Sequence, residues 1–210
     1  MKAVIVAAKR TAIGGFGQSL ASLSAVDIGS QLLKTVIDET PQLKSHIDEV
    51  ILGQVLTAGC GQNPARQTAL NAGLPISVSA FTINHVCGSG LKAVQLAAQS
   101  VLVGDAKMVV AGGQESMSQA AHVLPNNRAP KKLGDLSLVD SLIKDGLWDS
   151  RESIHMGITA ENIADKFIVP REAQDEFAAH SQQKAAHAIS NGLFKDEIAP
   201  LAIKKRGSDI

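Results

Sequence analysis

Aromatic side chains are scarce in this sequence, and its charges balance. The 210 residues include no tyrosine, and aromatic residues make up only 3% of the chain. Proteins that bind single-stranded nucleic acid usually stack bases on aromatic side chains, so this function is disfavoured. The 20 basic residues are matched by 20 acidic residues, which gives a net charge of zero. We therefore predict neither a nucleic-acid partner nor a membrane surface as a partner.

Long apolar runs and cysteines are also few. The longest apolar runs, such as Met108–Gly113, fall far short of the roughly 20 residues that a membrane-spanning helix requires. The apolar stretch before Lys9 is too short for a secretory signal. The 2 cysteines cannot form a zinc cluster by themselves, and a cytoplasmic chain keeps its thiols reduced. The sequence therefore predicts a cytoplasmic protein without a metal site and without a disulfide.

Apolar runs typical of buried strands alternate with amphipathic segments typical of helices. Ser24 is the expected N-cap of a helix over about residues 25–38, and Asn63-Pro64 opens a second helix. A third helix is expected over residues 91–103. This alternation predicts an α/β fold with a mainly parallel sheet that is covered on both faces. Strands are expected at Lys2–Ala8, Val50–Val55, Ser79–Val86 and Met108–Ala111.

The pattern changes after residue 118. Residues 119–154 hold few long apolar runs, and two helices are expected at about 157–167 and 171–190. We therefore predict an α/β domain over residues 1–118 and a mostly helical domain over 119–210. Because the chain does not return to the α/β pattern, the α/β domain is expected to be incomplete.

Cys87 is the strongest candidate for chemistry. It is expected where a strand meets a helix, close to free N–H groups and the positive end of the helix dipole, which favours the thiolate. Gly88 and Gly90 leave room for an acyl group and for backbone donors. The arrangement parallels a nucleophile elbow, with sulfur in place of a hydroxyl. The alternative is a buried structural cysteine at a glycine-rich turn.

Other candidates carry weaker signals. Cys60 has a loop setting and no obvious partner, which is typical of an ordinary loop thiol. His85 would share a strand face with Cys87, where it either polarises the thiolate or is satisfied by a backbone carbonyl. His155 alone is typical of a capping or packing residue. The loop Gly14–Gly17 lacks the G-x-G-x-x-G spacing, so a dinucleotide site has little support.

The segment Asn84–Ala93 resembles the thiolases, and further motifs of that family follow in the same order along the chain. Among thiolases the sequence is most similar to the biosynthetic type, whose activity is acetyl-CoA C-acetyltransfer, because of His155-Met156-Gly157 and a basic loop around residues 122–134. The other matching segments are Lys9–Gly17, Asn63–Gln67, Gly112–Ser118, Asp145–Asp149 and His155–Asn162.

The resemblance implies a thiolase-like α-β-α layered domain, with a mostly helical loop domain inserted after the fourth strand. In such an enzyme Cys87 takes an acetyl group as a thioester, the first half of a ping-pong reaction that converts two acetyl-CoA to acetoacetyl-CoA plus CoA. Leu147, His155 and Met156 match positions that line the pantetheine channel and the acyl pocket. No cofactor is implied beyond the coenzyme A thioester that is the substrate.

The family's second half is missing from this sequence. Thiolases carry a second α/β half with an N-E-A-F-A motif, a G-x-H-P motif and a C-x-G-G motif, and none of these occurs here. The resemblance therefore implies an N-terminal portion whose partners are the missing C-terminal half and further copies, in a tetramer assembled through the basic loop. Two alternatives are a non-catalytic remnant that binds CoA or a partner, and a relative of the β-ketoacyl synthases.

Overall fold

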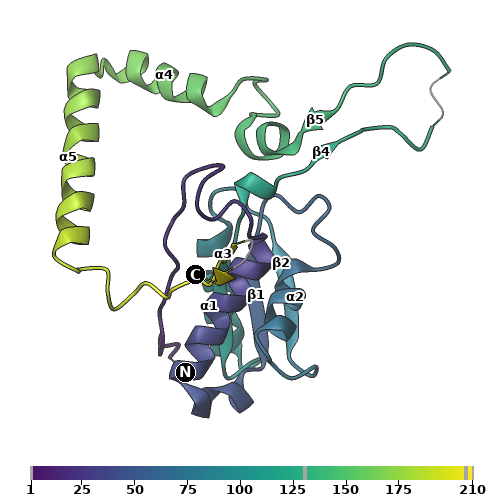
Figure 1. The fold of residues 1–210 in the computed structure, drawn as a ribbon, viewed down its shortest axis with the longest axis vertical. Coiled ribbons are helices and arrows are strands. Elements are labelled where there is room, and N and C mark those ends of the chain that lie inside the picture. The colour runs from purple at the N-terminus through teal and green to yellow at the C-terminus, as the bar shows by residue number, and fades with distance from the viewer. Residues whose placement is uncertain (1, 130–131, 206–207, 210) are drawn as a thin grey trace. The chain divides into compact units, whose positions relative to one another are not determined.

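Two compact units make up the chain. A computed structural model describes residues 2–129, 132–205 and 208–209. The first unit comprises Met1–Gly146 together with Ala199–Ile210, and the second comprises Leu147–Ile198. Figure 1 labels α1, α2, α3, β1, β2, β4 and β5 of the first unit and α4 and α5 of the second.

A three-stranded parallel sheet forms the centre of the first unit. Its strands are β1 (Glu49–Gly53), β2 (Ser79–Ile83) and β3 (Val109–Gly113), in the order β2-β1-β3. Glu49 is paired with Ser79 on one side and with Val109 on the other. The central strand is buried along almost its whole length, as expected for a parallel strand that is covered on both faces.

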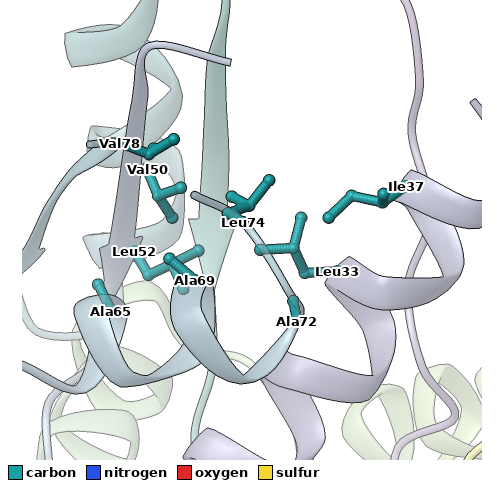
Figure 2. Close-up of a cluster of buried hydrophobic side chains, with 9 residues drawn as sticks. All are labelled: Leu33, Ile37, Val50, Leu52, Ala65, Ala69, Ala72, Leu74 and Val78. Atoms are coloured by element: carbon teal, nitrogen blue, oxygen red, sulfur yellow. The ribbon is translucent and has the colours of Figure 1, made fainter. Parts of the chain in front are cut away.

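Helices cover both faces of this sheet. On one face, α1 (Ala25–Glu39) and α2 (Pro64–Asn71) pack over alternate residues of β1. On the other face, α3 (Ser89–Val103) packs over Ile51. The predicted α/β fold class with an α-β-α layering is thereby confirmed. Figure 2 shows the larger core cluster, which consists of Leu33, Ile37, Val50, Leu52, Ala65, Ala69, Ala72, Leu74 and Val78.

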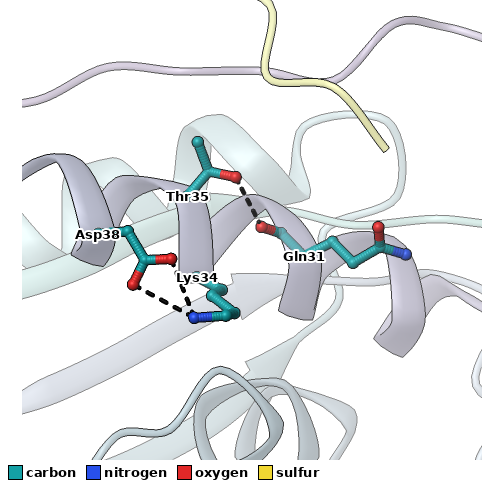
Figure 3. Close-up of polar contacts among 4 residues, drawn as sticks. All are labelled: Gln31, Lys34, Thr35 and Asp38. Carbon is teal, nitrogen blue, oxygen red and sulfur yellow. Dashed lines mark hydrogen bonds and ion pairs between the residues drawn. The ribbon is translucent and has the colours of Figure 1, made fainter. Parts of the chain in front are cut away.

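Local sequence signals set the helix ends and the outer surface of α1. Ser24 caps α1 in a reciprocal capping box with Asp27, and Asn63 caps α2 ahead of Pro64, as predicted. The exposed face of α1 carries an ion pair between Lys34 and Asp38 at 2.9 Å (Figure 3). The Thr35 hydroxyl donates to the Gln31 carbonyl one turn back, at 3.1 Å. Such exposed contacts contribute only a few tenths of a kcal/mol, so burial of the inner face dominates the stability of α1.

Lys2–Ala8 is not a strand, which corrects the first of the four predicted strands. The segment pairs with no strand among the described residues, and Val4 and Ile5 are 75% and 80% exposed. A strand is defined by ladder hydrogen bonds to a neighbour, and a local apolar run supplies neither the neighbour nor the covering layer. The other three predicted strands are confirmed with small shifts at their ends. The chain after Gly113 therefore follows the third observed strand.

The chain from residue 114 to 146 stays with the first unit. It contains the 3-10 helix η2 (Met117–Gln119) and the antiparallel pair β4 (His122–Val123) and β5 (Val139–Asp140). The π-helix η3 (Leu142–Leu147) follows, and only its last residue belongs to the second unit. Ser141 fastens this region, because its N–H and its hydroxyl both donate to the Ala121 carbonyl. The predicted boundary after residue 118 thus falls inside the first unit, while the role assigned to residues 119–210 stays a prediction.

The remaining elements are short or helical. The second unit consists mainly of α4 (Met156–Phe167) and α5 (Arg171–Ser190), close to the two helices expected there. After it the chain rejoins the first unit, where the Ala199 N–H donates to the Arg10 carbonyl at 2.8 Å. The first unit also contains the 3-10 helix η1 (Pro41–His46), which follows α1, and the strands β6 (Lys204–Lys205) and β7 (Ser208–Asp209) near the end of the chain.

One segment, Val86–Val103, is long and apolar enough to span a membrane by length and composition alone. Its helical part, α3, has only 15 residues, which corresponds to about 22 Å and is shorter than a bilayer core of about 30 Å. Ala93 of this helix is completely buried in the core under the sheet. The sheet covers the side of α3 that carries Ala93 and Ala97, whereas Leu91, Leu102 and Val103 are exposed.

Gly53 is the position where α3 approaches the sheet most closely. A Cβ atom placed on Gly53 would lie 2.5 Å from the Ser89 Cβ and 2.6 Å from the Ser89 carbonyl carbon. A Cβ placed on Gly112 of the neighbouring strand would meet nothing within 4 Å. The contrast makes these two glycines a matched pair for mutation.

We expect Gly53→Ala to lower the free energy of unfolding by about 1–3 kcal/mol, because the backbone of α3 must move to admit the methyl group. Gly112→Ala should change it by about 0.5 kcal/mol or less. Urea denaturation, monitored by circular dichroism, measures the free energy of unfolding of both variants. Equal losses in the two variants would show that the approach of α3 to β1 is not tight.

Candidate active site

A five-residue turn, Asn84–Gly88, connects β2 to α3 and carries Cys87. The thiol lies one residue before Gly88, the N-cap of α3, and Cys87 is exposed. The position between strand and helix agrees with the prediction. The exposure contradicts the alternative of a buried structural cysteine at this turn.

Val86 gives this turn its shape. Its φ of 48° lies in the left-handed region, which a β-branched residue rarely adopts and which costs about 1–2 kcal/mol. The Asn84 side-chain oxygen accepts the Val86 N–H at 2.9 Å. The Ser89 hydroxyl donates to the Val86 carbonyl at 2.6 Å and accepts the His85 N–H at 2.8 Å. Side chains on both sides of Cys87 therefore hold the strained residue next to it.

The first turn of α3 supplies a positive electrostatic environment beside Cys87. Gly88 has no side chain with which to cap the N–H groups of this turn. The first helical hydrogen bond runs from the Lys92 N–H to the Gly88 carbonyl at 2.9 Å. The Ser89 N–H donates to the Val86 carbonyl at 3.1 Å, so the favourable environment for negative charge on a thiolate or an acyl oxygen comes from the helix dipole and the N–H groups that follow Ser89.

Three glycines bring this helix terminus against the carboxyl ends of two strands. A Cβ on Gly53, the last residue of β1, would lie 2.8 Å from the Gly90 nitrogen. A Cβ on Gly113, the last residue of β3, would lie 3.4 Å from the Gly90 Cα. In open α/β sheets the carboxyl ends of the strands are the usual place for ligands. The Cys87 turn follows directly from that edge of the sheet.

A cleft of about 330 Å³ opens at the same edge. One wall comes from the loop after β1 and the start of α2, and the other comes from the end of β2 and Asn84. Asn84 therefore lines the cleft and also holds the Cys87 turn. The lining residues are Gln54, Thr57, Gly61, Asn63, Pro64, Thr82, Ile83 and Asn84.

A buried polar chain fixes the loop that forms the first wall. The Thr68 hydroxyl donates to Gln114 at 2.7 Å, and the Gln114 amide donates to Gln54 at 3.0 Å. Gln54 in turn donates to the Leu56 carbonyl at 3.1 Å. Thr68 is 0% exposed and Gln54 is 1% exposed, so each donor and acceptor here replaces a lost contact with water. The loop after β1 is thereby tied to the end of β3.

Glu115 holds the same loop through its backbone. Its carboxylate accepts the Val55 N–H at 2.8 Å and the Leu56 N–H at 3.3 Å. Burial raises the pKa of Glu115 above its ordinary value, although these two hydrogen bonds act in the opposite direction. Removal of the carboxylate from water thus outweighs the stabilisation by the two backbone donors.

Cys60 showed no obvious partner in the sequence, and the structure gives its thiol local hydrogen-bond partners. Its thiol is partly buried and donates to the Leu56 carbonyl at 3.4 Å, while Gln54 donates to its sulfur at 3.5 Å. These contacts are typical of a structural thiol. Cys60 and Cys87 are both free cysteines.

His85 does not share a strand face with Cys87, because β2 ends at Ile83. Its N–H donates to the Ser89 hydroxyl and its carbonyl accepts the Gly88 N–H at 3.1 Å, so its backbone takes part in the hydrogen bonds that hold the turn. Within the described residues, no group of three His, Cys, Asp or Glu side chains is placed to hold a metal ion.

The remaining predicted site residues, Leu147, His155 and Met156, lie in the second unit. His155 caps α4: its Nδ1 atom accepts the Gly157 N–H at 3.0 Å. This agrees with the capping role that was left open for it. Met156 is 37% exposed and begins α4. The assignment of these residues to a substrate channel stays a prediction.

Sequence reasoning missed Asn84, Ser89 and Glu115 as site residues. Asn and Ser next to a strand-to-helix turn are residue types whose side chains bond to nearby backbone groups, and this signal was available. Glu115 gave no such local signal, because its partners lie 59 and 60 residues away.

Comparison with known proteins gives consistent results. A family profile described as "Thiolase, N-terminal domain" matches residues 3–210. The acetyl-CoA acetyltransferase of Thiocystis violacea is 61% identical over 206 residues, which are 98% of this chain and 52% of that protein. The acetyl-CoA acetyltransferase of Pseudomonas aeruginosa is 55% identical, over 97% of this chain and 52% of that protein.

Solved structures agree with these matches. The crystal structure of the acetyl-CoA acetyltransferase of Bacillus anthracis has a TM-score of 0.94 at 36% identity, over 99% of this chain and 52% of that chain. The Acat5 thiolase from Ascaris suum, in complex with coenzyme A, has a TM-score of 0.87 at 43% identity, over 92% and 50% of the respective chains. The chain thus spans about half the length of the relatives that it matches.

We expect iodoacetamide to alkylate Cys87 at least about fivefold faster than Cys60 at pH 7–8, because Cys87 is exposed beside a helix N-terminus and Cys60 is partly buried. Mass spectrometry of the two cysteine-containing peptides measures both rates in one sample. Equal rates would return Cys87 to the status of an ordinary thiol.

We also expect a pH effect from Glu115. Because its pKa is raised in the folded state, the folded chain holds the proton to higher pH than the unfolded chain does. The stability of the wild type relative to Glu115→Gln should therefore decrease as the pH rises from the ordinary glutamate value of about 4.3 through the raised value. Denaturant titrations of both proteins at several pH values measure this difference. A constant difference would mean that the carboxylate is not desolvated.

Proposed function

This chain belongs to the thiolase family, and from that premise we propose that it acts in acetyl-CoA C-acetyltransfer, the interconversion of two acetyl-CoA with acetoacetyl-CoA plus CoA. The observation that carries the proposal is the exposed thiol of Cys87 on a strained turn before the N-terminus of α3. Because the chain spans only half of its relatives, the step assigned to its own residues is acylation of Cys87.

The acylation step uses the features of the turn directly. The Cys87 thiolate attacks the carbonyl carbon of acetyl-CoA and forms a new carbon–sulfur bond. The tetrahedral intermediate places a negative oxygen near the helix terminus, where N–H groups stabilise it. The intermediate then collapses, the bond to the CoA sulfur breaks, and the CoA thiolate leaves and takes up a proton. The product is an acetyl thioester on Cys87.

The second unit is proposed to hold the pantetheine arm through Leu147, His155 and Met156. His155 is suited to this task, because its Nδ1 atom accepts a backbone N–H and its proton is thereby assigned to Nε2. The exposed ring then offers an Nε2–H donor to an amide or thioester oxygen of the substrate. Leu147 and Met156 would supply apolar walls.

Completion of the reaction needs groups that this sequence does not carry. In the family, a histidine in the G-x-H-P motif and a cysteine in the C-x-G-G motif serve as bases, and neither motif occurs here. General base catalysis contributes about 10²–10⁴-fold at each step. We therefore propose that turnover requires a C-terminal thiolase half as partner. A second candidate function is binding of CoA or of a partner without catalysis.

The proposal extends to the chain's surroundings. Its ligand is acetyl-CoA or acetoacetyl-CoA, used as substrate without a further cofactor. The family's tetramer is the proposed assembly, formed through the basic loop 122–134, of which residues 130 and 131 lie outside the described part. The two free cysteines support a cytoplasmic location, where thiols remain reduced.

Incubation of the chain with radiolabelled acetyl-CoA tests the acylation step. We expect a labelled acetyl group on Cys87, located by mass spectrometry and labile to hydroxylamine, with release of CoA. Cys87→Ser should lose the thioester, whereas Cys60→Ala should keep it. Label on Cys60 or lysine in place of Cys87 would contradict the proposed role of Cys87.

Thiolysis of acetoacetyl-CoA then separates the two candidate functions. We expect very low turnover by this chain and recovery of activity when a C-terminal thiolase half is added. Binding of CoA without any acetyl transfer to Cys87, even with that half present, would favour the remnant. Robust turnover by this chain alone would contradict the need for a second half.

A further inference from the structure

We propose that Ser89 and Asn84 are positioning residues that set the reactivity of Cys87 by holding Val86 in its left-handed conformation; this inference deepens the proposed function and rests on it. Neither side chain needs to contact the substrate for this role. Both act through the backbone of the turn.

The hydrogen bonds of the turn converge on the two residues before Cys87. The Ser89 hydroxyl bridges them, because it accepts from the His85 N–H and donates to the Val86 carbonyl. Asn84 completes the set from the other side, by accepting the Val86 N–H at 2.9 Å. Both backbone polar groups of Val86 are therefore occupied while its φ stays at 48°.

Ser89 has little freedom to do anything else. It is 5% exposed, and its Cβ lies against Gly53 at the end of β1. The hydroxyl is thus fixed by the sheet on one side and by the helix on the other. A residue keeps a sparsely populated backbone conformation only when the surrounding structure holds it there. The contacts of Ser89 hold Val86 in this way.

The consequence for Cys87 follows from geometry. With Val86 left-handed, the chain reverses directly before α3, whose first turn has no side-chain cap, and Cys87 lies one residue before the N-cap. Without the hydrogen bonds from Ser89 and Asn84, Val86 can relax to an ordinary extended conformation, and the Cys87 sulfur then moves away from the N-terminus of α3. The sulfur would then lie farther from the positive end of the helix dipole, where a nucleophile that develops negative charge is less favoured.

The chain offers a matched control on the same helix. Among the described residues, Ser100 of α3 has a buried hydroxyl with no hydrogen-bond partner. Ser100→Ala therefore removes the same atom as Ser89→Ala without breaking a bond to the turn. For Asn84, Ser is the conservative variant, because its hydroxyl can also accept an N–H two residues ahead, and Ala is the disruptive one.

The test is the rate of Cys87 alkylation by iodoacetamide at pH 7, divided by the rate of Cys60 in the same sample. We expect Ser89→Ala and Asn84→Ala to lower this ratio by about threefold or more, the size of a helix-terminus effect on one charge. Ser100→Ala and Asn84→Ser should leave it within about twofold of the wild type.

The Cys60 rate separates positioning from general loosening, since partial unfolding would raise the Cys60 rate and lower the ratio for that reason alone. A lower ratio at an unchanged Cys60 rate supports the proposal. A ratio that Ser89→Ala changes no more than Ser100→Ala does, or that Asn84→Ala leaves unchanged, overturns it. Because Asn84 is exposed, we expect its variants to fold, and they test the proposal even if Ser89→Ala fails to fold. Because no acetyl-CoA is used, failure of acetyl transfer leaves this result intact.

Discussion

The contact between the first turn of α3 and the carboxyl ends of β1 and β3 determines the geometry of the candidate site. It exists because Gly53, Gly90 and Gly113 have no side chains, so that backbone meets backbone at van der Waals distance. A helix held this close to the sheet leaves a short connection from β2, only five residues long. Within that connection the left-handed Val86 reverses the chain. Tight packing thus keeps the connection short, and the hydrogen bonds of Asn84 and Ser89 hold the strained Val86 that presents Cys87.

The polar network beside the turn fixes the position of the loop after β1. This loop forms one wall of the cleft. Gln114 and Glu115, adjacent residues at the end of β3, hold this loop through the Gln54 side chain and the Val55 and Leu56 N–H groups. The Gln54 side chain is polar, buried and satisfied, a combination that specifies one arrangement because any other leaves a buried group unpaired. Hydrogen bonds from Gln114 and Glu115 and burial of Leu56 therefore both fix the wall of the cleft.

Features that depend on neighbouring residues could be predicted from the sequence, and features that depend on residues far apart in the chain could not. The caps at Ser24 and Asn63 and the three central strands follow from local patterns, and the structure confirms them. The prediction failed at Lys2–Ala8, because strand formation depends on a distant partner that a local run does not specify. The Gln114 contacts, which join residues 46 and 60 positions apart, could not be predicted for the same reason. Cys87 was found because its signal, a glycine-flanked thiol between strand and helix, is local.

The division of labour in the proposed reaction follows from where each kind of group is available. A helix terminus stabilises negative charge that is already present or develops in place, so it can favour a thiolate and an oxyanion. It cannot accept a proton, and the removal of a proton from the thiol or from the α-carbon of a second acetyl-CoA requires a base. Glu115 cannot serve, because its carboxylate is engaged by Val55 and Leu56. His155 caps α4 through the ring nitrogen that would have to act as the base. In the proposed reaction these features therefore suit capture of an acyl group, and carbon–carbon bond formation requires a base that neither Glu115 nor His155 provides.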